Sequence, residues 1–439
     1  MKSRAKSIDT DKVLPKMTDV VIIGGGILGV SAAYFLAKRG IAVTLCEKGV
    51  VAGEASSRAH GQVASAGLGD SKMELLVDSK RLWNELRATL GNDLGYRQNG
   101  YISPCQSDEE LGFWESWFEA IKQYEPDAAL LNGAELQRVA SFKNSFAGAY
   151  YNPSDGCAEP AMATPAIAAA ARKMGAKIIE GCAVRGLDSK AGHISEVITE
   201  MGSIQASTVI LAGGAWSMLF ARSLGVELPI LNVRAACQSV APIANGPKGT
   251  GDLPGVSWRQ EWDGGYSLSV IGVTVPIVPA MFRIGTKFLP SFKELGHHWE
   301  LKIRVDGEFI KELFTPATWP MNKPSPFEKS RISNAKIEYD FLRKARKRIV
   351  ETFPSFKGAQ VREEWGGIIT TTPDNMPTIS SVPKVPGLHL LTGFNYGLTM
   401  GPGAGNLMAE LITGDRPSVD PMPYRYERYI DGSELAVVA

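Results

Sequence analysis

The sequence predicts an α/β fold that combines a discontinuous Rossmann-type domain with an α+β domain built on an antiparallel sheet. Three observations lead to this prediction. A glycine-rich β-α-β pattern spans residues 19–48, two further glycine-rich strand ends occur within 207–216 and 365–414, and residues 233–365 are rich in short strands and turns. Ligands of doubly wound sheets bind at the carboxyl ends of the strands, so the separated glycine-rich segments are expected to meet at one sheet edge.

The β-α-β segment carries the most specific motif. A β-branched strand at 20–23 leads into Gly24, Gly26 and Gly29, which form G-x-G-x-x-G, and after a helix the second strand closes on Glu47. Gly24 permits the tight turn, Gly26 lets the backbone approach a pyrophosphate, and Gly29 lets the helix pack closely on the strand. The free N–H groups of the helix N-terminus favour phosphate, and the Glu47 carboxylate can accept hydrogen bonds from ribose hydroxyls. The segment therefore predicts a dinucleotide site.

Composition excludes several other classes of protein. The 439 residues carry a net charge of +1 and show no basic stripe, which argues against a nucleic-acid partner. The five cysteines are widely spaced and include no C-x-x-C pair, so the usual zinc and iron–sulfur spacings are excluded, no metal is expected, and a reduced cytosol is indicated. No apolar run reaches the roughly 18 residues of a transmembrane segment, and the first residues lack the apolar region of a secretory signal. We therefore expect a cytoplasmic protein.

Between the glycine-rich segments the chain alternates loops with amphipathic helices. Residues 52–69 are dominated by Ala, Gly and Ser and are predicted to form a long functional loop against a flat ligand. Leucines at helical spacing predict a helix over 70–90, a capping-box pattern at 107–110 opens a second helix, and Thr164 with Pro165 is a typical start for a third. The apolar and aromatic stripes of the first two helices are interpreted as core contacts.

The last section returns to the pattern of the first. A strand at 389–391 is followed by a predicted loop over 393–405, and a helix is predicted over 406–413. The helix N-terminus would emerge from a Gly-Pro-Gly-Ala-Gly turn, which would place a positive dipole end beside a loop of small residues. This arrangement suits an anionic ligand, although ordinary capping would also use a glycine there.

Several separated stretches match one family pattern. They are IIGGGILGVSAAYFLAKRG…EK, ASSRAHGQV, DGCAEPAMATPAIAAAARKMGA…V, VILAGGAWS and TPDNMP…LTGFNYGLTMGPGAGNLMAELITG. On these stretches the sequence resembles the flavin-dependent amine and amino-acid oxidoreductases of the D-amino-acid oxidase and sarcosine/glycine oxidase type. Residues 266–334 match the pattern poorly, so the resemblance constrains the substrate least.

The resemblance implies FAD as the cofactor and two domains. The FAD-binding domain would comprise residues 17–95, 150–232 and 360–425, the substrate domain residues 96–149 and 233–359, and the terminal tails residues 1–16 and 426–439. The glycine turn would hold the pyrophosphate, the acid after the second strand the adenosine ribose, and the loop before the last helix the pyrimidine end of the flavin. The positions that match cofactor-binding residues of the family are Gly24, Gly26, Ile27, Leu28, Glu47, Lys48, Ser57, His60, Gly61, Gln62, Val63, Val184, Gly213, Trp216, Gly397, Leu398, Thr399 and Met400.

The chain departs from the family pattern in two ways. Relatives of the sarcosine oxidase type attach the flavin through a cysteine just before a T-x-T-x-D segment, where this chain has residues 366–369 as Gly-Gly-Ile-Ile, so non-covalent FAD is expected. Relatives of the glycine oxidase type have an arginine nearby that grips the substrate carboxylate, where this chain has Ile369. Either Arg259 or Arg283 therefore reaches in from the substrate domain, or the substrate is not a simple small α-amino acid.

The implied reaction is oxidation of the C–N bond of an amine, or of a D- or N-substituted amino acid, by hydride transfer to flavin N5 to give an imine that hydrolyses. His60 and Tyr396 are the candidate catalytic residues, with structural hydrogen bonding as the alternative role for each. The apolar run at 270–278 favours a bulkier secondary amine or amino acid over glycine, sarcosine and D-alanine, unless the run is a core strand.

Other functions remain open at this stage. The electron acceptor would be O2 or a quinone or other carrier, and a dehydrogenase would be peripheral to the inner membrane rather than free in the cytoplasm. The cofactor domain alone is also compatible with a flavoprotein that oxidises a hydroxy acid. A third possibility is a flavin-binding subunit with a structural role in a larger oxidoreductase complex.

Overall fold

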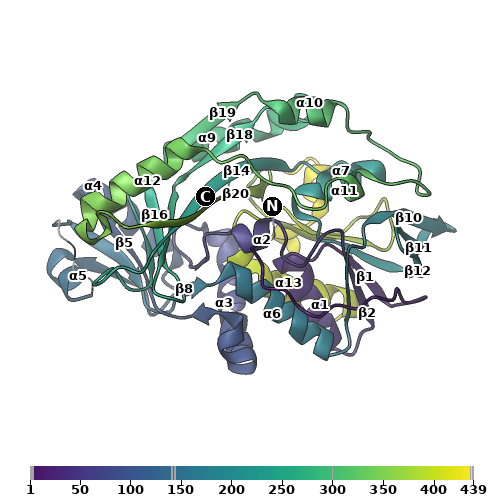
Figure 1. The fold of residues 1–439 in the computed structure, drawn as a ribbon, viewed down its shortest axis with the longest axis horizontal. Helices are drawn as coiled ribbons and strands as arrows, with labels where there is room; N and C mark the ends of the chain where they lie inside the picture. Colours follow the sequence, from purple (N-terminus) through teal and green to yellow (C-terminus); the bar gives the residue numbers. More distant parts are fainter. Residues whose placement is uncertain (1–3, 140–141, 143–144, 299, 436, 438–439) are drawn as a thin grey trace.

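The computed structural model describes residues 4–139, 142, 145–298, 300–435 and 437, and two large sheets form its framework (Figure 1). The first is the sheet that the glycine-rich motifs predict, with the strand order β21-β22-β13-β1-β2-β9. Its strands are β1 (Val20–Ile23), β2 (Val43–Glu47), β9 (Lys177–Glu180), β13 (Thr208–Leu211), β21 (Thr378–Ser381) and β22 (Leu388–Thr392). The strands from β22 to β9 are parallel, and β21 adds an antiparallel edge.

Strand β1 lies at the centre of this sheet, paired with β2 on one side and β13 on the other. Val20, Val21 and Ile22 are each at most 2% exposed. A parallel strand that is covered on both faces needs apolar side chains at every position, which explains the unbroken β-branched run in the sequence.

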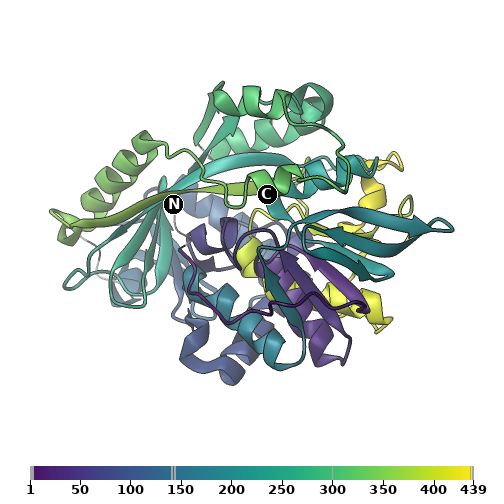
Figure 2. The ribbon, with the colours of Figure 1, turned by 45° about the vertical axis from the view of Figure 1, so that its right-hand side comes forward.

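The two faces of the parallel sheet are covered differently (Figure 2). Helices form the core with one face: α1 (Ile27–Lys38), α3 (Asp70–Leu90), α6 (Pro160–Lys173) and α13 (Gly397–Thr413). A small antiparallel sheet and a short helix cover the other: β10 (Val184–Lys190), β11 (His193–Thr199), β12 (Gly202–Gln205) and α7 (Ser217–Ser223).

The second large sheet is mostly antiparallel, as predicted, with parallel pairing between β5 and β15 and between β18 and β19. Its strands are β5 (Tyr101–Cys105), β6 (Ala129–Asn132), β7 (Gly148–Asn152), β14 (Leu231–Val240), β15 (Thr250–Leu253), β16 (Val256–Gln260), β17 (Tyr266–Val270), β18 (Gly272–Pro276), β19 (Glu300–Arg304) and β20 (Val361–Thr371). The long strand β14 pairs with β20 along its whole length. The two ends of the segment 231–371 therefore lie side by side in this sheet.

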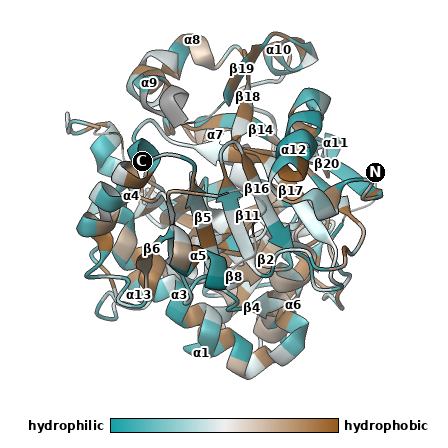
Figure 3. Cartoon of the chain, turned by 90° about the vertical axis from the view of Figure 1, so that its left-hand side faces the viewer, coloured by the Kyte–Doolittle hydropathy of each residue, from teal (hydrophilic) through white to brown (hydrophobic). Residues whose placement is uncertain are grey.

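Helices lie around this second sheet. They are α4 (Asp108–Ile121), α5 (Gly133–Val139), α8 (Met281–Ile284), α9 (Leu289–His298), α10 (Gly307–Leu313) and α12 (Tyr339–Thr352), whereas α11 (Pro326–Lys329) packs beside α7 against the parallel sheet. Figure 3 shows α8, α9, β19 and α10 together at one end of the molecule and α1 at the opposite end. Between the two large sheets lies a small one made of β3 (Gln62–Val63), β4 (Tyr96–Arg97) and β8 (Gly156–Ala158), preceded by the short helix α2 (Ala55–Arg58).

Several predicted helix ends are confirmed and others are wrong. Helix α3 spans the predicted residues, and the Ser107 side chain accepts a hydrogen bond from the Glu110 N–H at 3.2 Å as the N-cap of α4. The predicted start at Thr164 and Pro165 is wrong, because α6 begins with Pro160 and keeps Pro165 inside. The predicted loop at 52–69 also contains α2 and β3.

The largest error in the predicted secondary structure concerns α13. The prediction of a loop over 393–405 is wrong, because the helix begins at Gly397 and includes Pro402. Its glycines are required by packing rather than by a turn: a Cβ at Gly401 would lie 2.6 Å from the Ile27 side chain, and one at Gly405 would lie 2.5 Å from Cβ of Ser31. Small residues allow α13 to pack against α1 at backbone distance.

Sheet membership bears on the proposed division into domains. Strand β20 begins near residue 360, where the FAD-binding domain was expected to resume, yet it pairs with β14 in the antiparallel sheet. The expected tails are also partly anchored: the Asp11 N–H donates to the Ile178 carbonyl oxygen at 2.7 Å, and the side chains of Tyr426 and Tyr429 are buried. We keep the two-domain division as a proposal and assign β20 to the substrate domain within it.

The contact between α13 and α1 gives a stability prediction. Gly405→Ala places a methyl group within 2.5–2.7 Å of Ser31 and Ala32, so we expect a loss of about 1–3 kcal/mol in the free energy of unfolding, measured by urea denaturation. Gly112→Ala in α4 is the matched control, because a Cβ there meets nothing within 4 Å. The control should be neutral or slightly stabilising, and equal destabilisation of both variants would contradict the packing argument.

Candidate functional site

A pocket opens at the carboxyl ends of β1, β2 and β13, where the sequence predicts a dinucleotide. The space between its walls is about 920 Å³, open solvent at its mouth included. The lining residues are Ile23, Gly24, Gly26, Cys46, Glu47, Lys48, Ala52, Gly53, Glu54, Ala55, Ser56, Arg58, Val184, Leu211, Ala212, Gly213, Gly214, Ala215, Trp216, Phe220, Phe327, Ser333 and Ile368.

The glycine turn forms one wall of this pocket. Gly24 has φ +111°, and a Cβ there would lie 2.5 Å from the carbonyl oxygen of Ala212 at the end of β13. Only glycine therefore satisfies both the backbone conformation and the close strand crossing. The N-terminus of α1 follows, where the Ile27 N–H donates to Ser56 Oγ at 2.9 Å and Gly26 provides no side-chain cap. The first turn of α1 thus faces the pocket with little side chain in between.

Glu47 lies at the end of β2 with its carboxylate fixed in place. Oε2 accepts a hydrogen bond from the Gly25 N–H and Oε1 accepts one from the Gly49 N–H, both at 2.7 Å. Burial raises the pKa of Glu47, and these two backbone hydrogen bonds oppose that effect. The orientation of the carboxylate therefore exists before any ligand binds, which reduces the ordering cost of recognising ribose hydroxyls.

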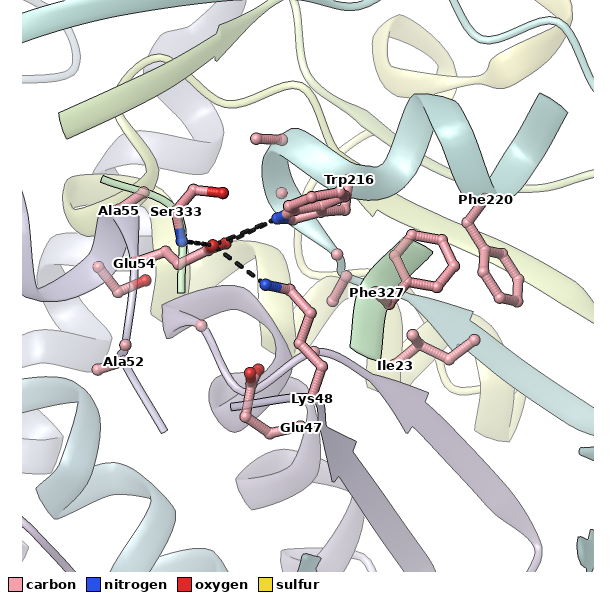
Figure 4. Close-up of a pocket in the computed structure, with 18 of the residues that line it drawn as sticks. Ile23, Glu47, Lys48, Ala52, Glu54, Ala55, Trp216, Phe220, Phe327 and Ser333 are labelled. Atoms are coloured by element: carbon pink, nitrogen blue, oxygen red, sulfur yellow. Dashed lines mark hydrogen bonds and ion pairs between the residues drawn. The ribbon is translucent and has the colours of Figure 1, made fainter. Parts of the chain in front are cut away.

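A polar cluster that the sequence does not reveal lies across the pocket from Glu47 (Figure 4). The Glu54 carboxylate accepts hydrogen bonds from Trp216 Nε1 at 3.0 Å and from the Ser333 N–H at 2.6 Å, and it pairs with Lys48 Nζ at 3.1 Å. Glu54 is the one acidic residue in the small-residue loop at 52–69, which is the signal that could have identified it. No sequence signal connects Ser333 with Glu54, 279 positions earlier, or Phe327 with Trp216.

His60 lies on the loop before β3, close to the antiparallel sheet. Its Nδ1 is 3.2 Å from Ser267 Oγ, and its Nε2 is buried and has no hydrogen-bond partner among the described residues. Burial and the nearby Arg259 charge lower the pKa of His60 to about 3, so the imidazole is neutral at physiological pH. A neutral ring with an unused nitrogen can donate or accept one hydrogen bond, but it cannot supply positive charge.

The small sheet and the start of α13 bring a second group of predicted residues together. Thr399 Oγ1 donates to the Gln62 carbonyl oxygen at 3.1 Å, and Gln62 Nε2 donates to Asp252 Oδ1 at 2.9 Å. Burial raises the pKa of Tyr396 to about 12, with the Asp252 charge as a smaller cause, so its hydroxyl stays protonated. This group lies at the junction of the two large sheets.

The predicted residues thus fall into two sets. Seven of them line the pocket: Gly24, Gly26, Glu47, Lys48, Val184, Gly213 and Trp216. The others that match the family pattern are not among the pocket-lining residues: Ile27, Leu28, Ser57, His60, Gly61, Gln62, Val63, Tyr396, Gly397, Leu398, Thr399 and Met400.

The three residues proposed for the substrate occupy different environments. Arg259 is 2% exposed, and its guanidinium donates to Glu159 Oε1 and to the His60 carbonyl oxygen, both at 2.7 Å. Arg283 is exposed on α8. Ile369 packs on the apolar cluster beneath α8, whereas its neighbour Ile368 lines the pocket. Arg259 is therefore already neutralised by a carboxylate.

The described residues contain neither a membrane-spanning helix nor a cluster of metal-binding side chains. No described helix combines the length and the apolar character needed to cross a bilayer. Within the same part of the chain, no group of three or more His, Cys, Asp or Glu side chains is arranged to hold a metal ion.

Comparison with known proteins decides the family. The model of the DAO family, described as FAD dependent oxidoreductase, matches residues 19–411. The chain is an FAD-dependent oxidoreductase of the DAO family. The observations at the pocket fit this cofactor, because the glycine turn, the exposed N-terminus of α1 and the preoriented Glu47 carboxylate are the groups that hold a dinucleotide.

Solved structures and curated sequences place the oxidoreductase within its family. An L-amino acid deaminase from Proteus myxofaciens, solved with anthranilate, is 35% identical with a TM-score of 0.94, and the alignment covers 98% of this chain and 97% of that one. An L-amino acid deaminase from Proteus vulgaris is 33% identical with a TM-score of 0.91, covering 95% and 99%.

The curated relatives are more distant in sequence. Mouse mitochondrial sarcosine dehydrogenase is 25% identical over 95% of this chain, which spans only 42% of that protein. The sarcosine oxidase subunit beta of Arthrobacter sp is 27% identical, with 95% of this chain aligned to 92% of the relative. The chain thus spans less than half of the mitochondrial protein but nearly all of the bacterial subunit.

Glu47 gives a binding prediction for this oxidoreductase. Charge-assisted hydrogen bonds are worth roughly 1.5–3 kcal/mol each, so Glu47→Ala should weaken FAD binding by about ten-fold or more while the apoprotein stays folded. The measurement is the FAD dissociation constant by flavin fluorescence, after acid precipitation has shown that wild-type FAD appears in the supernatant.

Glu180 supplies a matched control for this variant. It is the register partner of Glu47 on β9, and its Oε1 accepts a hydrogen bond from the Val51 N–H at 2.7 Å, but it does not line the pocket. If Glu180→Ala and Glu47→Ala reduced FAD affinity equally, Glu47 would be a structural acid rather than a cofactor ligand.

Proposed function

We propose that the oxidoreductase oxidises the C–N bond of an L-α-amino acid to an imine, which hydrolyses to a keto acid and ammonia. The observation that carries this proposal is the full-length likeness to two L-amino acid deaminases, which exceeds the likeness to the sarcosine enzymes in identity and to the glycine oxidases in both identity and TM-score. This differs from the expectation from the sequence, which named an amine or a D- or N-substituted amino acid as the substrate.

The chemistry divides between cofactor and protein. Bound FAD supplies the acceptor for the two electrons that leave the α-carbon with its hydrogen. The chain's own task is to orient the substrate, exclude water and hold the amine in its neutral form. Two of the predicted residues, His60 and Tyr396, fit an orienting role, because both are neutral at physiological pH.

His60 and Tyr396 are proposed as orienting groups. The unused Nε2 of His60 offers one buried hydrogen bond, and the raised pKa of Tyr396 keeps its hydroxyl as a donor. Since His60 has a pKa of about 3 and Tyr396 one of about 12, neither titrates between pH 5 and 9. A pH dependence of turnover in that range would therefore not come from either residue.

The substrate carboxylate needs a cation, and Arg283 is the better of the two predicted candidates. Arg259 already pairs with Glu159 and donates to the His60 carbonyl oxygen, so turning it outward would break both interactions. Arg283 lies on α8, whose Met281 and Ile284 share an apolar cluster with Ile369. The same cluster contains Val273 and Val275, so the apolar run at 270–278 is largely explained as core and carries no argument for substrate size.

The other functions considered from the sequence are less well supported. The named relatives act on amino acids, so a hydroxy acid is not favoured as the substrate, and a role as a subunit rests on one relative that is named as a subunit. Oxygen or a quinone or other carrier as electron acceptor, and a cytoplasmic or peripheral location, remain part of the proposal.

A substrate panel tests the proposed reaction. Under anaerobic conditions the flavin absorbance should bleach with an L-amino acid such as L-leucine or L-phenylalanine, with much slower bleaching by the D-enantiomers, glycine and sarcosine. Ammonia and keto acid should form in equal amounts when an acceptor is added. Faster bleaching by sarcosine or D-alanine would overturn the assignment to L-amino acids, and bleaching by 2-hydroxy acids alone would overturn oxidation of a C–N bond.

The proposed role of Arg283 can be tested separately. Arg283→Ala should raise the KM for the best amino acid at least ten-fold, because a bound carboxylate would lose a charged partner, while FAD affinity is unchanged. Arg304→Ala is the control: Arg304 lies on β19 and pairs with Glu338 at 3.3 Å on the surface of the same region. Unchanged KM in Arg283→Ala would show that another group holds the carboxylate.

A further inference from the structure

We propose that residues 319–334, here called the strap, form the outer wall of the FAD pocket and control the rate at which FAD leaves it. The strap is part of the connection between α10 and α12, in a region expected to belong to the substrate domain. It runs from α10 past α7 towards α2, so that it passes over the cofactor side of the molecule (Figure 1). Phe327 and Ser333 of the strap line the pocket.

The first half of the strap is fastened to β10. Trp319 Nε1 donates to the Arg185 carbonyl oxygen at 2.7 Å, and the Arg185 guanidinium makes two hydrogen bonds to Glu328, each 2.9 Å. The hydrogen bonds from Arg185 are the first cause that lowers the pKa of Glu328 to about 2, so the pair remains ionised at neutral pH. Because β10 begins at the pocket residue Val184, this fastening lies directly beside the cofactor site.

The centre of the strap carries its apolar contact with the pocket. Phe327 is 5% exposed, and its ring packs edge-to-face on Trp216 at 5.8 Å and on Trp319 at 5.2 Å. Ser325 forms a capping box with Glu328 that fixes the start of α11. Phe327 therefore closes the side of the pocket formed by the residues after β13.

The second half is fastened on the opposite side, at the end of β2. Lys48 Nζ donates to the carbonyl oxygens of Ser330 and Arg331, both at 2.8 Å. Arg331 in turn donates to the Lys48 carbonyl oxygen at 2.7 Å and to both carboxylate oxygens of Glu200. Two residues after Arg331, the Ser333 carbonyl oxygen accepts a hydrogen bond from Arg58 Nη1 at 2.6 Å.

Apart from the ring contacts of Phe327 and Trp319, which pack with the apolar cluster on one face of the parallel sheet, these attachments are polar and local, which makes the strap the natural place for the pocket to open. All of residues 314–338 are described, and apart from α11 they form no helix and pair with no strand. The parallel sheet and α1, by contrast, belong to a continuous core. Segments with little buried apolar surface of their own open at lower free energy than core elements. Release of FAD therefore requires the strap to detach from Arg185, Lys48 and Glu200, whereas the sheet stays intact.

The test is a double variant, Arg185→Gln/Arg331→Gln, in which both fastenings lose their charge although neither residue lines the pocket. The release rate is the rise of flavin fluorescence after dilution of the holoenzyme into excess ADP, which blocks rebinding. We expect release to be about ten-fold faster or more, with the thermal stability of the apoprotein changed little. The Arg331 and Glu200 side chains are 39% and 15% exposed, and an ion pair that is partly open to solvent contributes little on its own. Neither single variant is therefore expected to show the full effect.

A matched control separates the strap from general loss of ion pairs. The Arg172–Asp11 pair has the same side-chain exposures as the Arg331–Glu200 pair, 39% and 15%, but it fastens the N-terminal segment instead of the strap. Arg172→Gln should leave the release rate unchanged.

Limited proteolysis gives a second readout. Trypsin should cleave after the exposed Lys329 faster in the apoprotein than in the FAD complex, and faster again in the double variant. Equal release rates for the double variant, the control and the wild type, or cleavage after Lys329 that FAD does not slow, would overturn the proposal. Absence of FAD binding in the wild type would instead contradict the cofactor assignment.

Discussion

The crossing of Gly24 over the end of β13 is the constraint on which the rest of this structure depends. The turn after β1 adopts a positive φ and lies so close to the Ala212 carbonyl oxygen that no side chain fits between them. That crossing brings the carboxyl ends of β1, β2 and β13 to one edge and opens the space in which Glu47 faces the helix N-terminus. The cofactor pocket is a consequence of backbone geometry before any side chain is considered.

Close backbone contact recurs on the helical side of the same sheet. The glycines of α13 allow it to lie against α1, so the start of α13 reaches β3 and the Thr399 hydroxyl meets the Gln62 carbonyl oxygen. The two large sheets are joined at this point. Residues expected to surround the flavin therefore come from helix α13, the small sheet and the long loop after β2, and their positions depend on one another.

The polar groups around the site show how burial sets chemistry. Arg259 retains its charge because Glu159 compensates it, and that charge together with burial keeps His60 neutral. Tyr396 remains protonated for the related reason that burial disfavours a phenolate. A site with neutral hydrogen-bonding groups and a preorganised cofactor cradle suits a reaction in which orientation matters more than proton transfer by the protein.

The sequence by itself determined the cofactor cradle, because G-x-G-x-x-G, the buried strands and Glu47 follow one another within a single β-α-β unit whose geometry is local. It also indicated the antiparallel sheet and the extent of α3, since both depend on side-chain periodicity. Only the tertiary structure decided that the Gly-Pro-Gly-Ala-Gly segment is helical. Its glycines are needed for close packing against α1, which lies far away in the sequence. The same holds for the strap, where Ser333 contacts Glu54, Phe327 contacts Trp216 and Arg331 contacts Glu200. These partners are far apart in the sequence, so no local sequence pattern could predict the contacts.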